Sequence, residues 1–262
     1  MPVKSLHGAK SRIDPDGDGV GQTLALGFFH DTVDAVLATE RIARVVVVTH
    51  DAVVGAVARA KGCLIVDDTE HSGINAAAAW AVDQLPADGP VVVLVSDLPC
   101  LTVEAMTAVL DAADGRAAAF LADTEGTGTT MWLSARGTPV DSHFGPASAA
   151  AHRAVGAVDL ADIASDQASL TPARRDVDTE ADLAEALRVG VGPSTRDALA
   201  MIGSMSPVLV TALGRAADGS LEVADERGAR HRVDWQVVRA AGFLDVRPGQ
   251  RLVLHSGSVR LP

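Results

Sequence analysis

The strongest constraint on the fold is an alternation of short aliphatic runs with alanine-rich segments over roughly the first 200 residues. The aliphatic runs occupy residues 43–49, 63–68, 90–97 and 117–123. The segments of helical length around them occupy residues 23–41, 51–62, 75–85 and 102–115. Uninterrupted valine runs are typical of strands that are buried on both faces, so this order predicts an α/β fold with a largely parallel sheet.

Two further helices are predicted beyond these elements. Thr179 can cap the first of them, Asp182 stands at the third position of a capping box, and Gly190 or Gly192 can end it. The second covers residues 193–202. Because Thr179 is well placed as the cap, the acidic residues just before it are free for another role.

The pattern changes near residues 203–207, after which short alternating strands are separated by turns. The pairs Asp218-Gly219 and Arg227-Gly228 are typical of hairpin turns. A segment of this kind predicts a small β-barrel appended to the α/β domain. The sequence thus predicts two domains, residues 1–203 and residues 207–262.

The composition argues against several classes of protein. Of the 262 residues 48% are hydrophobic, which is typical of a globular chain with a core of its own. The formal net charge of −12 argues against bulk affinity for nucleic acid or for an anionic membrane. The two cysteines, Cys63 and Cys100, have no metal-ligand spacing, so we expect reduced thiols in a cytoplasmic protein. No stretch has the pattern of a signal peptide or the length of a membrane span.

Two acidic motifs predict a metal site. Asp97 follows a buried strand, and ligands bind open α/β sheets at the carboxyl ends of their strands. Asp176 and Asp178 follow a short apolar approach and precede Thr179, the better helix cap. Mg²⁺ prefers carboxylate oxygens and bridges to phosphates, so these side chains are candidate ligands. For Asp97, helix capping is an equal alternative.

Three turns of small residues are candidate anion-binding elements. Residues 125–132 are rich in glycine and threonine, and residues 143–152 are rich in alanine. In the second segment Ser148 stands at the start of an alanine-rich helix. Gly73 and Asn75 stand at the start of another helix. At such a position an asparagine is more often a cap than a base-reading residue.

Three cations, Lys4, Lys10 and Arg12, lie near the first residue and are interpreted as a phosphate site rather than a solvated tail. With the aspartates and the turns they suit Mg²⁺-dependent chemistry on a nucleoside triphosphate. The chain lacks the G-x-x-x-x-G-K-[ST] and G-x-G-x-x-G motifs, which argues against a P-loop NTPase and a dinucleotide dehydrogenase. Residues 14–19 (DPDGDG) look like a calcium loop, but Ala25 stands where that loop needs a glutamate, so we interpret them as a polar loop.

Five motifs, PVKSLxxAKSR, SDLPCL, GTGTT, FGPxSxxxH and DVDTxxDL, follow one another along the chain. In this order they resemble the guanylyltransferases of coenzyme F-420 biosynthesis, a family that comprises 2-phospho-L-lactate guanylyltransferase and phosphoenolpyruvate guanylyltransferase. The resemblance covers residues 1 to about 200. It implies a Rossmann-like, three-layer nucleotidyltransferase sandwich. The implied reaction transfers GMP from GTP to phosphoenolpyruvate or 2-phospho-L-lactate and releases pyrophosphate.

The resemblance also implies roles for particular residues. The triphosphate would be bound and neutralised by Lys4, Lys10 and Arg12, of which Lys10 and Arg12 would also act in catalysis. The nucleoside would lie against Gly73 and Asn75, Mg²⁺ would be carried by Asp97, Asp176 and Asp178, and the acid would be held by Thr129, Gly145 and Ser148.

Two features depart from the family. Several apolar residues usually precede PVKSL and form a central strand, whereas here Met1 directly precedes Pro2. We therefore expect that the true start lies upstream or that Met1 occupies a strand position, and that the basic segment is poorly anchored if the chain begins here. Residues 207–262 extend beyond the minimal enzyme and resemble a cold-shock or OB-like barrel. Their eight arginines, six acidic residues and two aromatic residues, Trp235 and Phe243, favour a structural or oligomer-supporting role over RNA binding.

Two alternative functions stay open at this point. One is a guanylyltransferase of another pathway, such as molybdenum-cofactor maturation, whose acceptor is a pterin phosphate. The other is a nucleic-acid-binding protein that acts through the barrel. The sequence selects neither between the two acids nor between guanine and other bases, and it leaves a homo-oligomer open.

Overall fold

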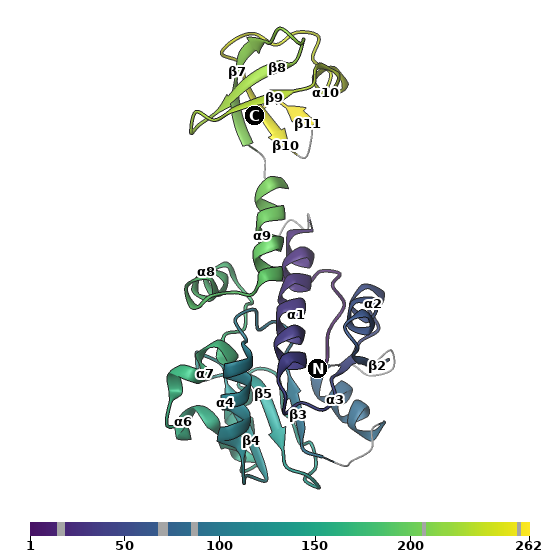
Figure 1. Cartoon of the computed structure of the whole chain (residues 1–262), viewed down its shortest axis with the longest axis vertical. Coiled ribbons are helices and arrows are strands. Elements are labelled where there is room, and N and C mark those ends of the chain that lie inside the picture. The colour runs from purple at the N-terminus through teal and green to yellow at the C-terminus, as the bar shows by residue number, and fades with distance from the viewer. Residues whose placement is uncertain (15–18, 68–72, 85–88, 206–207, 256–257) are drawn as a thin grey trace. The chain divides into compact units, whose positions relative to one another are not determined.

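The computed structural model describes residues 1–14, 19–67, 73–84, 89–205, 208–255 and 258–262, and it divides into two compact units, 1–198 and 199–262 (Figure 1). The elements that begin in the first unit are α1 (Val20–Ala38), β1 (Val46–Val48), α2 (Ala52–Ala60), β2 (Leu64–Val66), α3 (Ile74–Asp83), β3 (Val91–Leu94), α4 (Val103–Ala113), β4 (Ala118–Ala122), β5 (Thr129–Ser134), α5 (Ser148–Ala154), β6 (Val158–Asp159), α6 (Leu160–Ile163), α7 (Gln167–Arg174), α8 (Glu180–Val189) and α9 (Pro193–Met205). The predicted alternation of strands and helices is confirmed from α1 to β4.

The larger sheet of the first unit has the order β3-β5-β4-β6. Strand β5 is antiparallel to both β3 and β4, and only β4 and β6 pair in parallel. The prediction of a largely parallel sheet is therefore wrong for these four strands. Strand β5 escaped the prediction because the small residues Gly126–Thr130 indicate a turn, and the apolar run Met131–Leu133 that follows is too short to indicate a strand.

Side chains of this sheet alternate between two apolar cores, as the period of two in a strand requires. Leu121 and Met131 belong to one core, which residues of α1, α4 and α7 complete. Phe120 and Trp132 belong to a second core, which residues of α3 and α5 complete. Figure 1 shows α4, α6 and α7 gathered beside β4 and β5. The sheet is thus buried on both faces, which explains its nearly continuous apolar strands.

A second, two-stranded sheet of β1 and β2 is parallel, and Pro2 forms an isolated parallel bridge with Val48. The amino group of Met1 donates to the Val46 carbonyl at 2.9 Å. Met1, Pro2 and residues of β1, β3 and α3 line a cavity of about 570 Å³. The isolated bridge agrees with the expectation that little strand precedes the basic segment.

The second unit contains β7 (Val208–Arg215), β8 (Leu221–Asp225), β9 (Arg230–Val233), α10 (Trp235–Ala240), β10 (Arg251–His255) and β11 (Ser258–Arg260). Its sheet has the order β11-β10-β7-β8-β9, and every pairing is antiparallel. Gly219 and Gly228 adopt positive φ angles of 85° and 81° in the two predicted hairpin turns. The sheet curls into a half-barrel around an apolar core that includes Leu221, Val223 and Leu252. Among the described residues β9 and β11 are open edges, so the predicted barrel is not closed.

None of the helices in the described part of the chain combines the length and apolar character that a membrane span requires. Both cysteines are free and buried.

Candidate active site

Asp97 lies just beyond the carboxyl end of β3, in a turn that α1 holds in place. The Thr32 hydroxyl of α1 accepts from the Leu98 N–H at 3.0 Å, and its single hydrogen is shared between the Phe28 carbonyl at 2.7 Å and the Ser96 carbonyl at 3.3 Å. Thr32 is fully buried. The turn is thus fixed on both sides of Asp97, whose carboxylate is partly exposed at the edge of the sheet.

The basic segment is anchored by Asp51, the residue that caps α2. Its carboxylate accepts from the backbone N–H groups of Val53 and Val54 at the start of the helix. It also accepts from the Leu6 N–H at 2.9 Å and the Ser5 hydroxyl at 3.2 Å. The expectation of poor anchoring is therefore not met, because one half-buried carboxylate ties the segment to α2.

Lys10 joins the two acidic motifs. Its ammonium group forms ion pairs with Asp97 and with Asp178, the second at 2.9 Å, although the partners are 87 and 168 residues away in the chain. Desolvation by burial lowers the pKa of Lys10, but the attraction of the two carboxylates outweighs it and raises that pKa overall. The Lys10 backbone has a φ of 55°, a left-handed conformation that is costly for a residue with a side chain and is frequent at functional sites.

Asp178 lies in a field of positive charge. Partial burial raises its pKa, but Lys10, Arg12 and Lys4 act in the opposite direction and lower the pKa overall. All three cations of the basic segment are therefore close enough to stabilise the ionised carboxylate. As predicted, Thr179 caps α8 in a capping box with Asp182, so the Asp178 side chain is not the helix cap.

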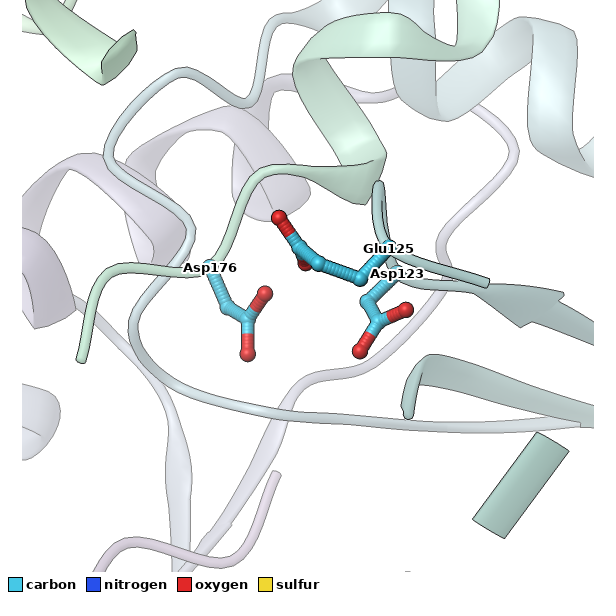
Figure 2. A group of neighbouring side chains, drawn as sticks. All are labelled: Asp123, Glu125 and Asp176. Atoms are coloured by element: carbon cyan, nitrogen blue, oxygen red, sulfur yellow. The ribbon is translucent and has the colours of Figure 1, made fainter. Parts of the chain in front are cut away.

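Asp176 belongs to a second acidic group with Asp123 and Glu125 (Figure 2). One carboxylate oxygen from each of the three lies within 4.8 Å of the others. The segment that carries Asp176 is held against the end of β4 because Arg174 donates to the carbonyls of Ala122 and Asp123 at 3.0 and 2.7 Å. Burial, followed by the repulsion of nearby aspartates, raises the pKa of Asp176 to about 7.

The three residues expected to hold the acid lie at the start of β5 and at the start of α5. Thr129 is the first residue of β5, and its hydroxyl lies 2.9 Å from Nδ1 of His152. Ser148 begins α5 and is 2% exposed. Gly145, with a φ of 142°, accepts at its carbonyl from the Ser148 N–H at 3.1 Å.

Asn75 has a structural partner that the sequence did not indicate. Its amide Nδ2 donates to the Phe144 carbonyl at 2.9 Å, and its Oδ1 accepts from the Phe144 N–H at 2.8 Å and from the Ser142 hydroxyl at 3.2 Å. Gly73 occupies the cap position of the same helix, α3, with a φ of 90°. The Asn75 side chain is thus used to hold the loop between β5 and α5.

The structure brings Lys10 into direct contact with Asp97 and Asp178. Two further acidic residues near Asp176, Asp123 and Glu125, were not predicted from the sequence. Asp123 ends the strand 117–123, so the same signal that singled out Asp97 was present for it. Its carboxylate accepts from the Thr127 and Gly128 N–H groups at 2.9 and 2.7 Å.

The loop at residues 14–19 cannot be compared with its prediction, since residues 15–18 lie outside the described part of the chain.

A helix-covered mixed sheet with cations and carboxylates gathered at the strand ends defines an α/β protein of the nucleotidyltransferase type. A putative nucleotide-diphospho-sugar transferase from Desulfovibrio desulfuricans has this fold, with a TM-score of 0.52 and 19% identity over 77% of this chain and 93% of its own. The chain belongs to the guanylyl transferase CofC-like family, whose model matches residues 1–215. It is 42% identical to a phosphoenolpyruvate guanylyltransferase of Streptomyces avermitilis and 44% identical to one of Streptomyces coelicolor. These matches cover 77% and 74% of this chain and 93% and 92% of the relatives.

Proposed function

We propose that this protein transfers GMP from GTP to phosphoenolpyruvate and releases pyrophosphate. A phosphate oxygen of the acid attacks the α-phosphorus of GTP, the new phosphoanhydride bond forms, and the bond to the β-phosphate oxygen breaks. The relatives that support this substrate pair are named phosphoenolpyruvate guanylyltransferases, and about nine-tenths of their length is matched. Chemistry of this kind needs in-line positioning and charge neutralisation rather than a protein nucleophile.

The observation that carries the proposal is the position of Lys10 between Asp97 and Asp178. Because Asp97 and Asp178 both contact one ammonium group, their carboxylates are close enough to bind one cation together. When a triphosphate is present, Lys10 and Arg12 neutralise its charge during transfer and Lys4 contributes to binding. All three cations stabilise the ionised form of Asp178, which supports a triphosphate contact beside that carboxylate.

The donor set fits a hard divalent cation, because it consists of carboxylate oxygens at the end of a sheet. Asp97, Asp176 and Asp178 would hold Mg²⁺, with Asp123 and Glu125 next to Asp176. The ion supplies charge neutralisation at the phosphates when it is bound. The elevated pKa of Asp176 supports this assignment, because burial and then the repulsion of Asp97, Asp123 and Asp178 disfavour its charged form, and a bound cation would offset that repulsion.

Thr129, Gly145 and Ser148 are proposed to hold the acid. Ser148, buried at the start of α5, carries a hydroxyl that can donate to a carboxylate or phosphate, and the Thr129 hydroxyl is a second such group. Gly73, at the start of α3, is proposed to lie against the nucleoside. Asn75 contributes there through the loop that it holds, because its amide is engaged with Ser142 and Phe144.

The second unit is proposed to be a structural or oligomer-supporting module of the cold-shock or OB-like kind, in a cytoplasmic enzyme. The Arg215 guanidinium lies over the Trp235 ring at 3.6 Å, so one face of this ring is already covered. Single-strand binding uses open aromatic faces in a cationic groove. This observation supports the module role over RNA binding.

The test is release of pyrophosphate from GTP in the presence of Mg²⁺, in four parallel reactions: with phosphoenolpyruvate, with 2-phospho-L-lactate, with a pterin phosphate and with no acceptor. We expect release that depends on phosphoenolpyruvate. Release only with 2-phospho-L-lactate would change the acceptor, and release with a pterin phosphate but neither acid would favour the molybdenum-cofactor type of enzyme. Absence of release with every acceptor would contradict the proposal.

A matched pair of variants links the reaction to this site. Asp97→Asn removes the charge shared with Lys10 and is expected to abolish turnover with an unchanged melting profile. Asp111→Asn removes a charge on α4 that forms an exposed ion pair with Arg41, and it is expected to leave turnover unchanged. Unchanged turnover in Asp97→Asn would remove Asp97 from the site.

A further inference from the structure

The motif that begins at Phe144 ends in His152, a residue with no role so far. His152 lies on α5 and is fully buried. Its ring is surrounded by the rings of Trp132, Phe120 and Phe144, with centroid distances of 4.9, 5.2 and 5.7 Å. Burial lowers the pKa of His152 to about 4, so the imidazole is neutral near pH 7. A neutral imidazole has one nitrogen that donates and one that accepts.

The hydrogen bonds decide which nitrogen of His152 carries the proton. The backbone N–H of His143 donates to Nε2 at 2.7 Å, and a backbone N–H can act only as a donor. Nε2 is therefore the accepting nitrogen and Nδ1 carries the hydrogen. Since Nδ1 lies 2.9 Å from the Thr129 hydroxyl oxygen, His152 donates to Thr129.

This direction determines what the Thr129 hydroxyl can do. Its oxygen accepts from His152, so its own hydrogen is not used in that bond and is available to another acceptor. A carboxylate or phosphate offers only acceptors at neutral pH, so it binds to a hydroxyl that can donate. In the opposite tautomer Thr129 would donate to His152 and would present only lone pairs to an anion.

The same ring also fixes the loop between β5 and α5. His152 accepts from residue 143, and the Asn75 amide holds residue 144 through its N–H and its carbonyl. Two consecutive residues are thus tied to α5 and α3, immediately before Gly145. His152 therefore connects the strand that carries Thr129 with the loop that leads to Ser148.

We propose that His152 is a positioning residue for the acceptor acid: it orients the Thr129 hydroxyl as a donor and ties the loop of Gly145 and Ser148 to the same strand. The proposal rests on the proposed function, because the ligand held by Thr129 is the phosphorylated three-carbon acid. His152 does not touch the reacting atoms in this role.

Two substitutions test the two hydrogen bonds of His152, to Thr129 and to His143, one at a time. In His152→Asn the amide nitrogen stands near the position of Nδ1 and can donate to Thr129, whereas in His152→Gln the amide oxygen stands near Nε2 and can accept from His143. We expect His152→Gln to raise KM for phosphoenolpyruvate about tenfold or more, as for loss of one hydrogen bond to a charged group, and His152→Asn to raise it less. The KM for GTP is expected to change less than twofold in both, which a merely structural loss would not produce.

A double-mutant cycle with Thr129→Val tests the connection. If His152 acts through the hydroxyl, His152→Gln adds no further increase in KM for the acid once Thr129 is valine. Full additivity of the two changes would overturn the proposal. Equal changes in KM for the acid and for GTP would overturn it too.

The tautomer can be measured without any substitution, which covers the case in which buried His152 variants fail to fold. Nitrogen-15 NMR of the histidine-labelled, full-length protein should show the proton of His152 on Nδ1 from pH 6 to pH 8. A proton on Nε2 would overturn the proposal. Wild-type protein that releases no pyrophosphate with phosphoenolpyruvate would instead reject the proposed function, and with it this role, whatever the tautomer.

Discussion

Two aspartates that are separated by one residue have opposite electrostatic environments at this site. The pKa of Asp178 is lowered because Lys10, Arg12 and Lys4 outweigh its partial burial. The pKa of Asp176 is raised to about 7 because it is buried among other carboxylates. Asp178 therefore pairs with the basic segment, whereas Asp176 lies among carboxylates, where we propose that a cation binds.

Replacement of Lys10 by methionine should separate catalysis from folding. Lys10→Met keeps the length of the side chain but removes the charge shared by Asp97 and Asp178. We expect kcat to fall by roughly 10²–10³, the usual cost of removing one group that stabilises developing charge. The matched control is Lys61→Met, which removes an ion pair with Asp34 outside the site. Equal kcat values in both variants, measured by pyrophosphate release, would contradict the role of Lys10.

Asp176 should make the metal-free protein less stable as pH rises. Its folded pKa of about 7 lies above the ordinary aspartate pKa of 3.8, so the unfolded chain loses this proton first, and the stability of the protein falls between about pH 4 and pH 7. Asp176→Asn lacks this ionisation. We therefore expect the variant to melt at a higher temperature than wild type in EDTA, with a difference that grows from pH 5 to pH 8 and reaches about 2 °C or more.

Addition of Mg²⁺ at pH 8 should reverse this difference. A bound cation stabilises the folded wild type by mass action, whereas Asp176→Asn has lost one carboxylate ligand. Melting curves at a series of Mg²⁺ concentrations measure the effect. A difference between the proteins that is independent of both pH and Mg²⁺ would contradict the assignment of Asp176.

At the scale of elements, α1 connects the site to the end of the α/β unit. Thr32 holds the turn of Asp97, and the next residue toward the N-terminus, Asp31, is buried. The two oxygens of Asp31 accept from the N–H groups of Ser194 and Thr195 at 2.9 Å each. A side chain of α1 therefore caps the start of α9.

Loss of this cap should cost stability and little activity. Asp31→Ala leaves two N–H groups of α9 without their acceptor, and we expect a loss of about 2–3 kcal/mol in the free energy of unfolding. Asp34→Ala on the same helix removes only an ion pair at an exposed carboxylate and should cost less than about 1 kcal/mol. Urea unfolding measures both values. Similar losses in the two variants would show that the bonds of Asp31 are not important for stability.

At the scale of the whole molecule, all residues proposed for the site lie in the first unit, residues 1–198. An alignment of 206 residues already takes in 93% of the Streptomyces avermitilis relative. The second unit has its own core and its own sheet. The half-barrel can therefore be removed without removing any residue of the proposed site.

A chain that ends at residue 205 should retain kcat and KM values within about twofold of the full chain, because no residue of the site is removed. Steady-state pyrophosphate release measures this, and light scattering of both chains reports any change in oligomeric state. A gel-shift assay with single-stranded RNA should show no binding by either chain. A shift with the full chain alone would establish RNA binding through the second unit.

Much of this protein could be predicted from its sequence because the relevant signals are local. Helix length, valine runs and the capping box of Thr179 and Asp182 depend on residues that are close in the chain, and they were predicted correctly. The motifs also indicated Lys10, Asp97 and Asp178 as residues of one site. Their order along the chain carried the family resemblance, which the family model supports.

Only the tertiary structure decided how these local pieces meet. The direction of β5 was not predictable from periodicity, since parallel and antiparallel strands share the same alternation of side chains. The addition of Asp123 and Glu125 to Asp176, and the tautomer of His152, likewise depend on distances between segments that are remote in the chain. A sequence pattern specifies which groups are present and on which face they lie. Their hydrogen bonds and pKa values depend on the neighbours that folding brings within a few ångströms, because electrostatic and hydrogen-bond energies fall steeply with distance.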